Sequence, residues 1–181
     1  MNSFKLLVIN PGSTSTKVSV FENEMELGKK ELKHSSDELA KYATAAEQVN
    51  LRKQSILQYM DELGVEMSEI HAIAARVVGR WGKYLAGAYE INELMVEDCK
   101  KNPGKHGSIV SPIIAYEWAK KYGIKSYIYD VVPVDELDDI ARISGSPLIE
   151  RMGASHTLNT KATARVVAKE IGRTYEDVTF I

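Results

Sequence analysis

Residues 4–17, FKLLVINPGSTSTK, decide how the fold is interpreted. Segment 4–9 is an apolar run with the length of a buried β-strand. The run ends at Asn10, after which Pro and Gly lead into four consecutive hydroxyl residues and then Lys17. Apolar and polar residues alternate over 17–21, which predicts a second strand. The sequence therefore predicts a strand–turn–strand unit whose turn is rich in hydrogen-bond donors.

Residue chemistry leaves two interpretations of this turn open. In the first, the turn binds phosphate, because backbone N–H groups around Gly12 form an anion-binding concavity and Lys17 adds a positive charge. It is not a Walker A loop, which needs two glycines at fixed spacing, a Lys-Ser/Thr pair and a following helix. In the second, it is an ordinary hairpin, since Pro, Gly, Ser and Thr all favour turns. Asn10 favours the first interpretation, because ligand sites in α/β proteins lie at the C-terminal ends of strands.

Strand and helix patterns alternate along the rest of the chain. We expect strands over 25–32, 70–78 and 124–129, another beginning at 178, and helices over 36–63, 93–101, 111–122, 134–143 and 158–171. Ser111 is expected to be the N-cap of its helix. The order of elements indicates an α/β fold. Because the apolar run 178–181 has no turn after it, we expect the complete protein to continue.

Composition argues against several functional classes. The chain has 181 residues, 44% of them hydrophobic, which suffices for one good core or two small ones. A net charge of −2 and a pI of about 6.1 give no indication of nucleic-acid binding. No apolar run is long enough to cross a membrane, and the N-terminal run is too short for a signal peptide. Cys99 is the single cysteine, so no intrachain disulfide can form, and we expect a cytoplasmic protein.

Residues 10–17, following LLVI, resemble the first phosphate motif of the acetate and butyrate kinase family, which belongs to the actin-like ATPase superfamily. The spelling INPGSTSTK is most similar to butyrate kinases and branched-chain carboxylate kinases. Five later segments resemble family motifs in the family's order: VVGRWG (77–82), GAYEINELMVED (87–98), GKHGS (104–108), YDVVPVDELDDIARISGSP (129–147) and SHTLNTKATAR (155–165). The resemblance implies an α/β fold of the actin-like, ribonuclease H-like type, with a mixed β-sheet flanked by helices.

The resemblance also implies roles for the matching residues. Asn10 would lie near the Mg²⁺-bound phosphate, and the cofactor phosphates would be bound by Gly12, Ser13, Thr14, Ser15 and Lys17. Catalytic positions are matched by Arg80, Asp130 and His156. Substrate-binding positions are matched by Arg80, by Arg76 as its rival, and by His106. Each residue also has an ordinary structural explanation, such as a helix cap for Asp130, and the shared order of the motifs is what favours a site.

The implied reaction transfers the γ-phosphoryl group of ATP to a short-chain carboxylate such as butyrate or isobutyrate, giving an acyl phosphate and ADP reversibly, with Mg²⁺. The attacking carboxylate is already ionised at pH 7, so no strong base is needed. The difficulty is to bring two anions together, which Mg²⁺, an Arg and hydrogen-bond donors offset. Arg80 suits this role because a guanidinium holds two oxygens at once. The resemblance further implies a homodimer or a higher homo-oligomer.

Several positions depart from the family pattern: Trp81 replaces Gly, Lys105 replaces Glu, Gly107 replaces Ala, and Pro133 is shifted relative to Asp130. These departures keep open the alternative of a degenerate half-kinase that binds ligand or dimerises without catalysis. A sugar kinase of the same superfamily is a weaker alternative. In this superfamily ATP binds between two similar domains. We therefore expect residues 1–181 to be the N-terminal acetokinase-type domain, without the C-terminal nucleotide-binding domain, and to be inactive alone.

Overall fold

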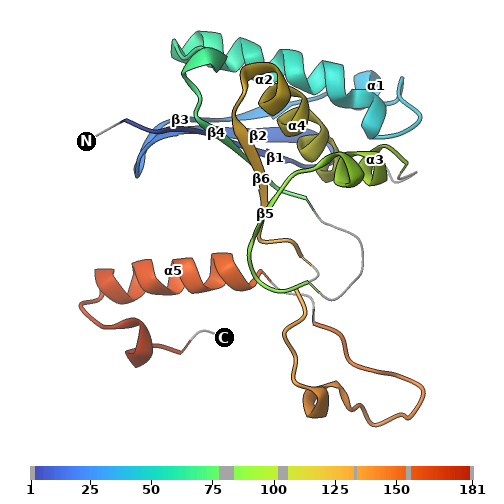
Figure 1. The fold of residues 1–181 in the computed structure, drawn as a ribbon, viewed down its shortest axis with the longest axis vertical. Helices are drawn as coiled ribbons and strands as arrows, with labels where there is room; N and C mark the ends of the chain where they lie inside the picture. Colours follow the sequence, from blue (N-terminus) through green and yellow to red (C-terminus); the bar gives the residue numbers. More distant parts are fainter. Residues whose placement is uncertain (1–2, 78–83, 102–105, 133, 154–155, 180–181) are drawn as a thin grey trace. The chain divides into compact units, whose positions relative to one another are not determined.

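The computed structural model describes residues 3–77, 84–101, 106–132, 134–153 and 156–179, which form two compact units (Figure 1). The first unit comprises Met1–Val78 and Ala88–Tyr129, and the second comprises Gly79–Gly87 and Asp130–Ile181. Among the described residues, no helix has both the length and the apolar character needed to cross a membrane.

A six-stranded mixed sheet forms the centre of the first unit, with the strand order β3-β2-β1-β4-β6-β5. Strands β1 (Lys5–Pro11), β2 (Ser15–Glu22) and β3 (Met25–Lys33) form an antiparallel meander. Strands β4 (Ala72–Ala75) and β6 (Lys125–Tyr129) run parallel to β1, whereas the edge strand β5 (Ala88–Glu90) is antiparallel. The parallel strands end at one edge of the sheet, where the β1–β2 turn also lies. This is the edge at which α/β sheets commonly bind ligands.

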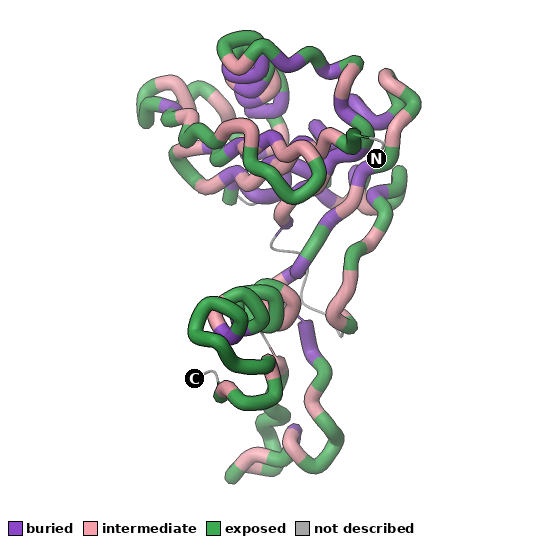
Figure 2. Tube along the Cα trace, turned by 90° about the vertical axis from the view of Figure 1, so that its left-hand side faces the viewer, coloured by how far each residue is buried: buried purple, intermediate pink, exposed green. Residues whose placement is uncertain are grey.

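The main core lies between one face of this sheet and the helices α2 (Val49–Leu63) and α4 (Val110–Tyr122) (Figure 2). Helix α4 packs on β1, β4 and β6, while α2 packs on α4 and β3. Alternate strand residues face the helices, among them the fully buried Leu7, Ile9 and Val18. Gly28 permits the close approach of α2, since a Cβ there would lie 2.7 Å from the hydroxyl of Tyr59. Helix α3 (Glu93–Lys101) packs on α4 and buries Cys99.

The second unit is more open than the first. Its longest helix in the described residues, α5 (Thr157–Glu170), buries only Ala164 and Ala168. Before α5 the chain is mostly extended and contains a 3₁₀ turn at Asp139–Arg142. Another 3₁₀ turn, Tyr175–Asp177, follows α5. Large apolar side chains in this unit are exposed: Ile140, Ile143, Leu148, Ile149 and Met152. Figure 2 shows the trace of this unit mostly in the colours of exposed and intermediate residues.

The strand–turn–strand opening and the strands predicted over 25–32, 70–78 and 124–129 are confirmed, whereas the strand predicted to begin at 178 is not formed at its described residues and several helix boundaries differ. The predicted helix 36–63 is broken into α1 (Ser36–Leu39) and α2. Between them the Glu47 carboxylate accepts the Ala43 N–H at 3.0 Å, which ties the chain into a local turn. Helix α4 begins at Val110, and the Ser111 hydroxyl donates to backbone carbonyls instead of serving as the N-cap.

Short elements account for the other differences. The predicted helix over 134–143 is not formed, and the segment contains the 3₁₀ turn Asp139–Arg142 instead. Arg142 donates to the Asp135 carboxylate and to the Leu137 carbonyl, which folds the segment back in a way that a helix would not allow. Strand β5 lies in a segment for which no strand was predicted. Val178 and Thr179 are not in a strand, and residues 180–181 lie outside the described residues.

Candidate functional site

The turn between β1 and β2 is closed by backbone hydrogen bonds. The Gly12 N–H donates to the Ser15 carbonyl at 2.8 Å, and the His34 N–H donates to the Thr14 carbonyl at 2.8 Å. Ser13 and Thr14 are exposed at its tip. Within the part of the chain that the structure describes, no acceptor lies on the backbone N–H groups of these two residues. The turn therefore presents two adjacent donors, as expected for an anion-binding concavity.

Arg52, on α2, lies beneath the turn and was not predicted from the sequence. Its side chain is fully buried. Nη1 donates to the Ser15 carbonyl and the Thr16 hydroxyl, both at 2.9 Å, and Nη2 donates to the Ser13 carbonyl at 3.1 Å. Nε and Nη2 also donate to Gln48 Oε1. Burial lowers the pKa of Arg52 to about 10.

A sequence signal for Arg52 did exist. The buried face of α2 contains Val49, Ile56, Tyr59 and Met60, at the spacing of an amphipathic helix. Arg52 falls on this same face, three residues after Val49 and four before Ile56. A charged residue on the apolar face of a helix needs hydrogen-bonding partners in the core. Its position predicts a buried polar contact, although not which backbone atoms would supply it.

The four hydroxyl residues of the turn do not all face the solvent. Ser13 and Thr14 are exposed, whereas the Ser15 hydroxyl donates to Glu31 Oε1 on β3 at 2.8 Å. Thr16 is fully buried, and its hydroxyl lies 3.0 Å from Nε2 of His34. Burial and the charge of Arg52 lower the pKa of His34, with Glu38 opposing them. The hydroxyl of Thr16 is thus part of the support of the turn.

Gly107 packs against the turn from the loop before α4. A Cβ at this position would lie 2.0 Å from the Gly12 carbonyl oxygen and 2.9 Å from Nη2 of Arg52. No side chain fits at such distances, so the close approach requires glycine. This explains in physical terms why Gly stands here although the family pattern has Ala.

Asn10 and Arg76 meet at the C-terminal ends of β1 and β4. The Arg76 N–H donates to the Ile9 carbonyl at 3.0 Å, and Nη1 donates to Asn10 Oδ1 at 3.3 Å. Asn10 is also in register with Lys17 on β2, so both side chains lie on the same face of the sheet. The structure therefore brings together the predicted metal residue, one predicted substrate residue and the lysine of the turn. Arg80, together with Trp81, lies outside the described residues.

His106 is exposed beside Gly107. Its Nδ1 accepts the Ser108 N–H at 3.2 Å, which places the proton of a neutral ring on Nε2. The Ser108 hydroxyl lies 2.8 Å from the same nitrogen. His106 can therefore offer an Nε2–H donor to an anion. Lys105, the departure next to it, lies outside the described residues.

Asp130 and His156 form a pair within the second unit. Asp130 is buried and has a φ of 53°, a left-handed conformation that costs free energy for a non-glycine residue. Oδ2 lies 3.1 Å from His156 Nδ1, and Oδ1 accepts the Leu158 N–H at 3.0 Å. The carboxylate thus orients both the ring and the start of α5. Pro133, the departure close to Asp130, lies outside the described residues.

A resident metal cage is not apparent. Among the described residues, no group of three or more His, Cys, Asp or Glu side chains is placed to hold a metal ion. Mg²⁺ in phosphoryl transfer is commonly held through substrate phosphates, water and one or two protein oxygens. The amide oxygen of Asn10 fits that limited role.

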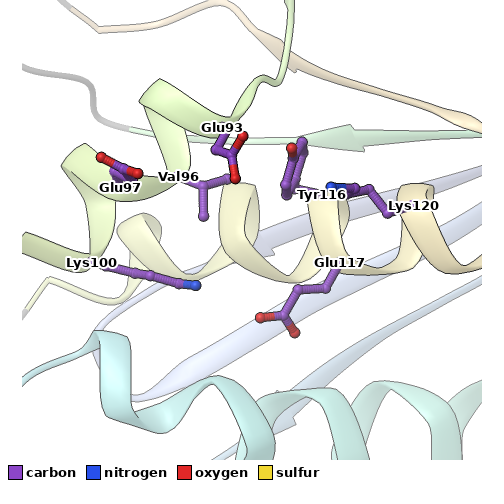
Figure 3. A pocket seen from close by; sticks show the side chains of 7 residues that line it. All are labelled: Glu93, Val96, Glu97, Lys100, Tyr116, Glu117 and Lys120. Atoms are coloured by element: carbon purple, nitrogen blue, oxygen red, sulfur yellow. The ribbon is translucent and has the colours of Figure 1, made fainter.

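A separate hollow of about 370 Å³ lies between α3 and α4 (Figure 3). Charged side chains of both signs contribute to its lining. The lining residues are Glu93, Val96, Glu97, Lys100, Tyr116, Glu117 and Lys120. It contains none of the predicted site residues. Glu117 is paired with Lys53 at 2.8 Å.

Comparisons with known proteins find sequence relatives among the butyrate kinases. No protein-family model matches the chain. Butyrate kinase 1 of Clostridium acetobutylicum is 44% identical over 98% of this chain and 50% of its own length. Butyrate kinase 2 of the same organism is 46% identical, and probable butyrate kinase 1 of Thermotoga maritima is 41% identical, with the same coverage. The chain spans about half the length of these relatives.

Two solved structures share the fold. Porphyromonas gingivalis acetate kinase gives a TM-score of 0.61 at 17% identity, over 95% of this chain and 50% of that one. A propionate kinase from Francisella tularensis gives 0.54 at 17% identity, over 94% and 50%. These matches confirm the predicted actin-like α/β fold with its mixed sheet and flanking helices.

Proposed function

Because this chain is 41–46% identical to butyrate kinases and spans about half of their length, we propose that it belongs to the butyrate kinase family and is the N-terminal domain of a butyrate-type carboxylate kinase. The complete protein would transfer the γ-phosphoryl group of ATP to a short-chain carboxylate such as butyrate or isobutyrate. The observation that carries this proposal is the exposed tip of the β1–β2 turn, with two backbone donors supported from beneath by Arg52.

The first unit would contribute the anion-binding groups. The N–H groups at Ser13 and Thr14, together with Lys17, offer donors and positive charge to phosphoryl oxygens. Arg76, held beside Asn10, is the described arginine that would bind the carboxylate or the transferred phosphoryl group. Mg²⁺ arriving with the nucleotide would neutralise phosphate charge, and Asn10 is the residue that would lie near it.

The second unit would contribute the Asp130–His156 pair. With Asp130 ionised, Nδ1 of His156 carries the proton that joins them, so a contact between His156 and a phosphoryl oxygen would be made through Nε2. The strained backbone of Asp130 supports a functional assignment, because such strain persists where the surrounding contacts hold it. The proposed cofactors are ATP or ADP and Mg²⁺. We also propose a cytoplasmic protein that forms a homodimer or a higher homo-oligomer.

The test compares chain lengths. The natural protein is purified and its intact mass measured, and both it and the 181-residue chain are assayed with MgATP and butyrate, trapping acyl phosphate with hydroxylamine. We expect a mass near twice 20.2 kDa, activity in the longer protein and none in residues 1–181. A natural protein of 20.2 kDa that binds phosphate without turnover would instead support the non-catalytic half-kinase. Acyl phosphate formed by the 181-residue chain alone would overturn the domain assignment.

A further inference from the structure

We propose that Arg52 is a positioning residue of the phosphate turn, and that an anion bound on the exposed side of the turn supplies the negative charge that the buried guanidinium lacks. The inference rests on the proposed function, because it takes the β1–β2 turn to be the phosphate site. It adds a residue on a different element, α2, that no motif in the sequence indicates.

The charge of Arg52 is surrounded by neutral hydrogen-bond acceptors. All four acceptors of Arg52 are neutral: the Ser13 and Ser15 carbonyls, the Thr16 hydroxyl and the Gln48 amide oxygen. Within the described ranges no carboxylate lies within salt-bridge distance of its guanidinium. A buried cation is costly to maintain unless its charge is compensated. A phosphate on the turn would provide that compensation across a single layer of backbone.

Arg52 also sets the direction of a peptide group in the turn. A trans peptide unit is planar, so its C=O and the following N–H point in opposite directions. Arg52 holds the Ser13 carbonyl toward the core, and the N–H of the same peptide unit, which belongs to Thr14, therefore points away from it. This N–H has no acceptor among the described residues. Arg52 thus fixes a donor in the orientation that an anion needs before the anion binds.

Close packing around Arg52 makes the turn rigid. Gly107 packs so closely that a Cβ would overlap the Gly12 carbonyl and touch Arg52. Gln48, at the N-cap position of α2, accepts two hydrogen bonds from the guanidinium, at 3.1 and 2.9 Å. The turn, α2 and the loop before α4 are therefore joined at one point. Arg52 cannot adopt another rotamer without losing its hydrogen bonds to the turn and to Gln48. It therefore holds the turn in one orientation.

The matched control is Arg142 in the second unit. It is also a buried arginine, but its Nη1 is 2.7 Å from Asp135 Oδ2, so its charge is compensated within the protein. Replacing either arginine by Gln removes a buried guanidinium of the same size. Only the Arg52 variant should change anion binding, because Arg142 takes no part in the turn.

The experiment measures the affinity of the 181-residue chain for inorganic phosphate at constant ionic strength, for wild type, Arg52→Gln, Arg52→Lys and Arg142→Gln. We expect Arg52→Gln to weaken phosphate binding about tenfold, as for a lost charge-assisted interaction. Arg52→Lys should recover part of the affinity, since it retains the charge. Arg142→Gln should lower thermal stability but leave the affinity unchanged. Equal losses in the two Gln variants, or phosphate binding by Arg52→Gln within twofold of wild type, would overturn the inference.

A second measurement needs no variant and covers the case in which Arg52→Gln fails to fold. Phosphate is titrated into isotopically labelled wild type while the side-chain Nε–H resonances of both arginines are followed. The Arg52 resonance should shift with phosphate and the Arg142 resonance should not. If wild type binds phosphate and the Arg52 resonance does not move, the inference fails alone. If wild type does not bind phosphate at all, the proposed function of the turn fails with it.

Discussion

Each unit buries an arginine, and the two arginines differ in whether their hydrogen-bond acceptors are charged. Arg52 in the first unit has only neutral acceptors, and burial lowers its pKa to about 10. Arg142 in the second unit donates to Asp135, which raises the pKa of Arg142 and lowers that of Asp135 to about 2. A guanidinium that is paired with a carboxylate of the same unit stabilises the local fold. A guanidinium whose acceptors are neutral carbonyls and a hydroxyl can still attract an anion from outside the protein.

The largest expected effect is at the packing around Arg52. Gly107→Ala would place a Cβ 2.0 Å from the Gly12 carbonyl oxygen, so the turn must move. We expect a loss of about 3 kcal/mol in the free energy of unfolding, together with weaker phosphate binding. Chemical denaturation and phosphate titration would measure the two effects.

The control for this change is Gly145→Ala in the second unit, where a Cβ would meet nothing within 4 Å. Its effect on stability should be close to zero. If Gly107→Ala were as stable as Gly145→Ala, the close contact between the loop before α4 and the turn would not exist in solution.

A smaller effect is expected in the second unit at acidic pH. The folded pKa of Asp135, about 2, is below its ordinary value of 3.8, mainly because Arg142 donates to it. The resulting stabilisation is complete above about pH 3.8 and is lost as the pH falls toward 2. Hydrogen exchange in residues 134–153 should follow this loss. Asp135→Asn should remove the pH dependence, whereas Asp139→Asn, whose side chain is fully exposed, should retain it.

The first unit should respond at milder pH, through His34. Its folded pKa is lowered by burial and by Arg52, so the neutral form is favoured in the folded state. Stability is therefore complete above about 6.5, the ordinary value, and decreases as the pH falls below it. Thermal unfolding of wild type and His34→Gln would measure this loss of stability. The measurements would run from pH 5 to pH 8, the range over which histidine titrates. A persistent slope in His34→Gln would assign it to another group, and His71→Gln, at an exposed position, serves as the control.

The smallest effect concerns the carboxylate beside the turn. Glu31 accepts the Ser15 hydroxyl and lies opposite Lys17 in the β2–β3 register. Glu31→Gln should therefore tighten phosphate binding about threefold, by removing an exposed negative charge. Isothermal titration with phosphate would detect it. Glu62→Gln, which removes an exposed carboxylate paired with Lys30, should leave the affinity unchanged.

The sequence predicted what depends on local pattern. The β1–β2 unit, the parallel strands β4 and β6, and α5 follow from apolar periodicity and glycine stops. The resemblance assigned Asn10 and Arg76 to one site, and the structure brings their side chains together where β1 and β4 end. Strand β5 was missed because its three residues, Ala88–Glu90, carry too little pattern.

Arg52 and Gly107 could not have been assigned from pattern alone. Each acts through a contact with a part of the turn that lies tens of residues away in the sequence. Arg52 contacts the Ser13 carbonyl, and Gly107 contacts the Gly12 carbonyl. Such contacts appear only once the sheet and helices are assembled. The roles of Arg80, Asp130 and His156 in catalysis remain predictions from the resemblance.

The buried hydroxyl of Thr16 has a spectroscopic consequence. Arg52 donates to its oxygen, and the arrangement that leaves no buried hydroxyl proton unpaired has Thr16 donating to Nε2 of His34. A proton held between two such partners, on a fully buried side chain, exchanges slowly with water. It should give a separate hydroxyl resonance in the proton NMR spectrum. The protein would then carry an intrinsic probe beneath its turn, with no label attached.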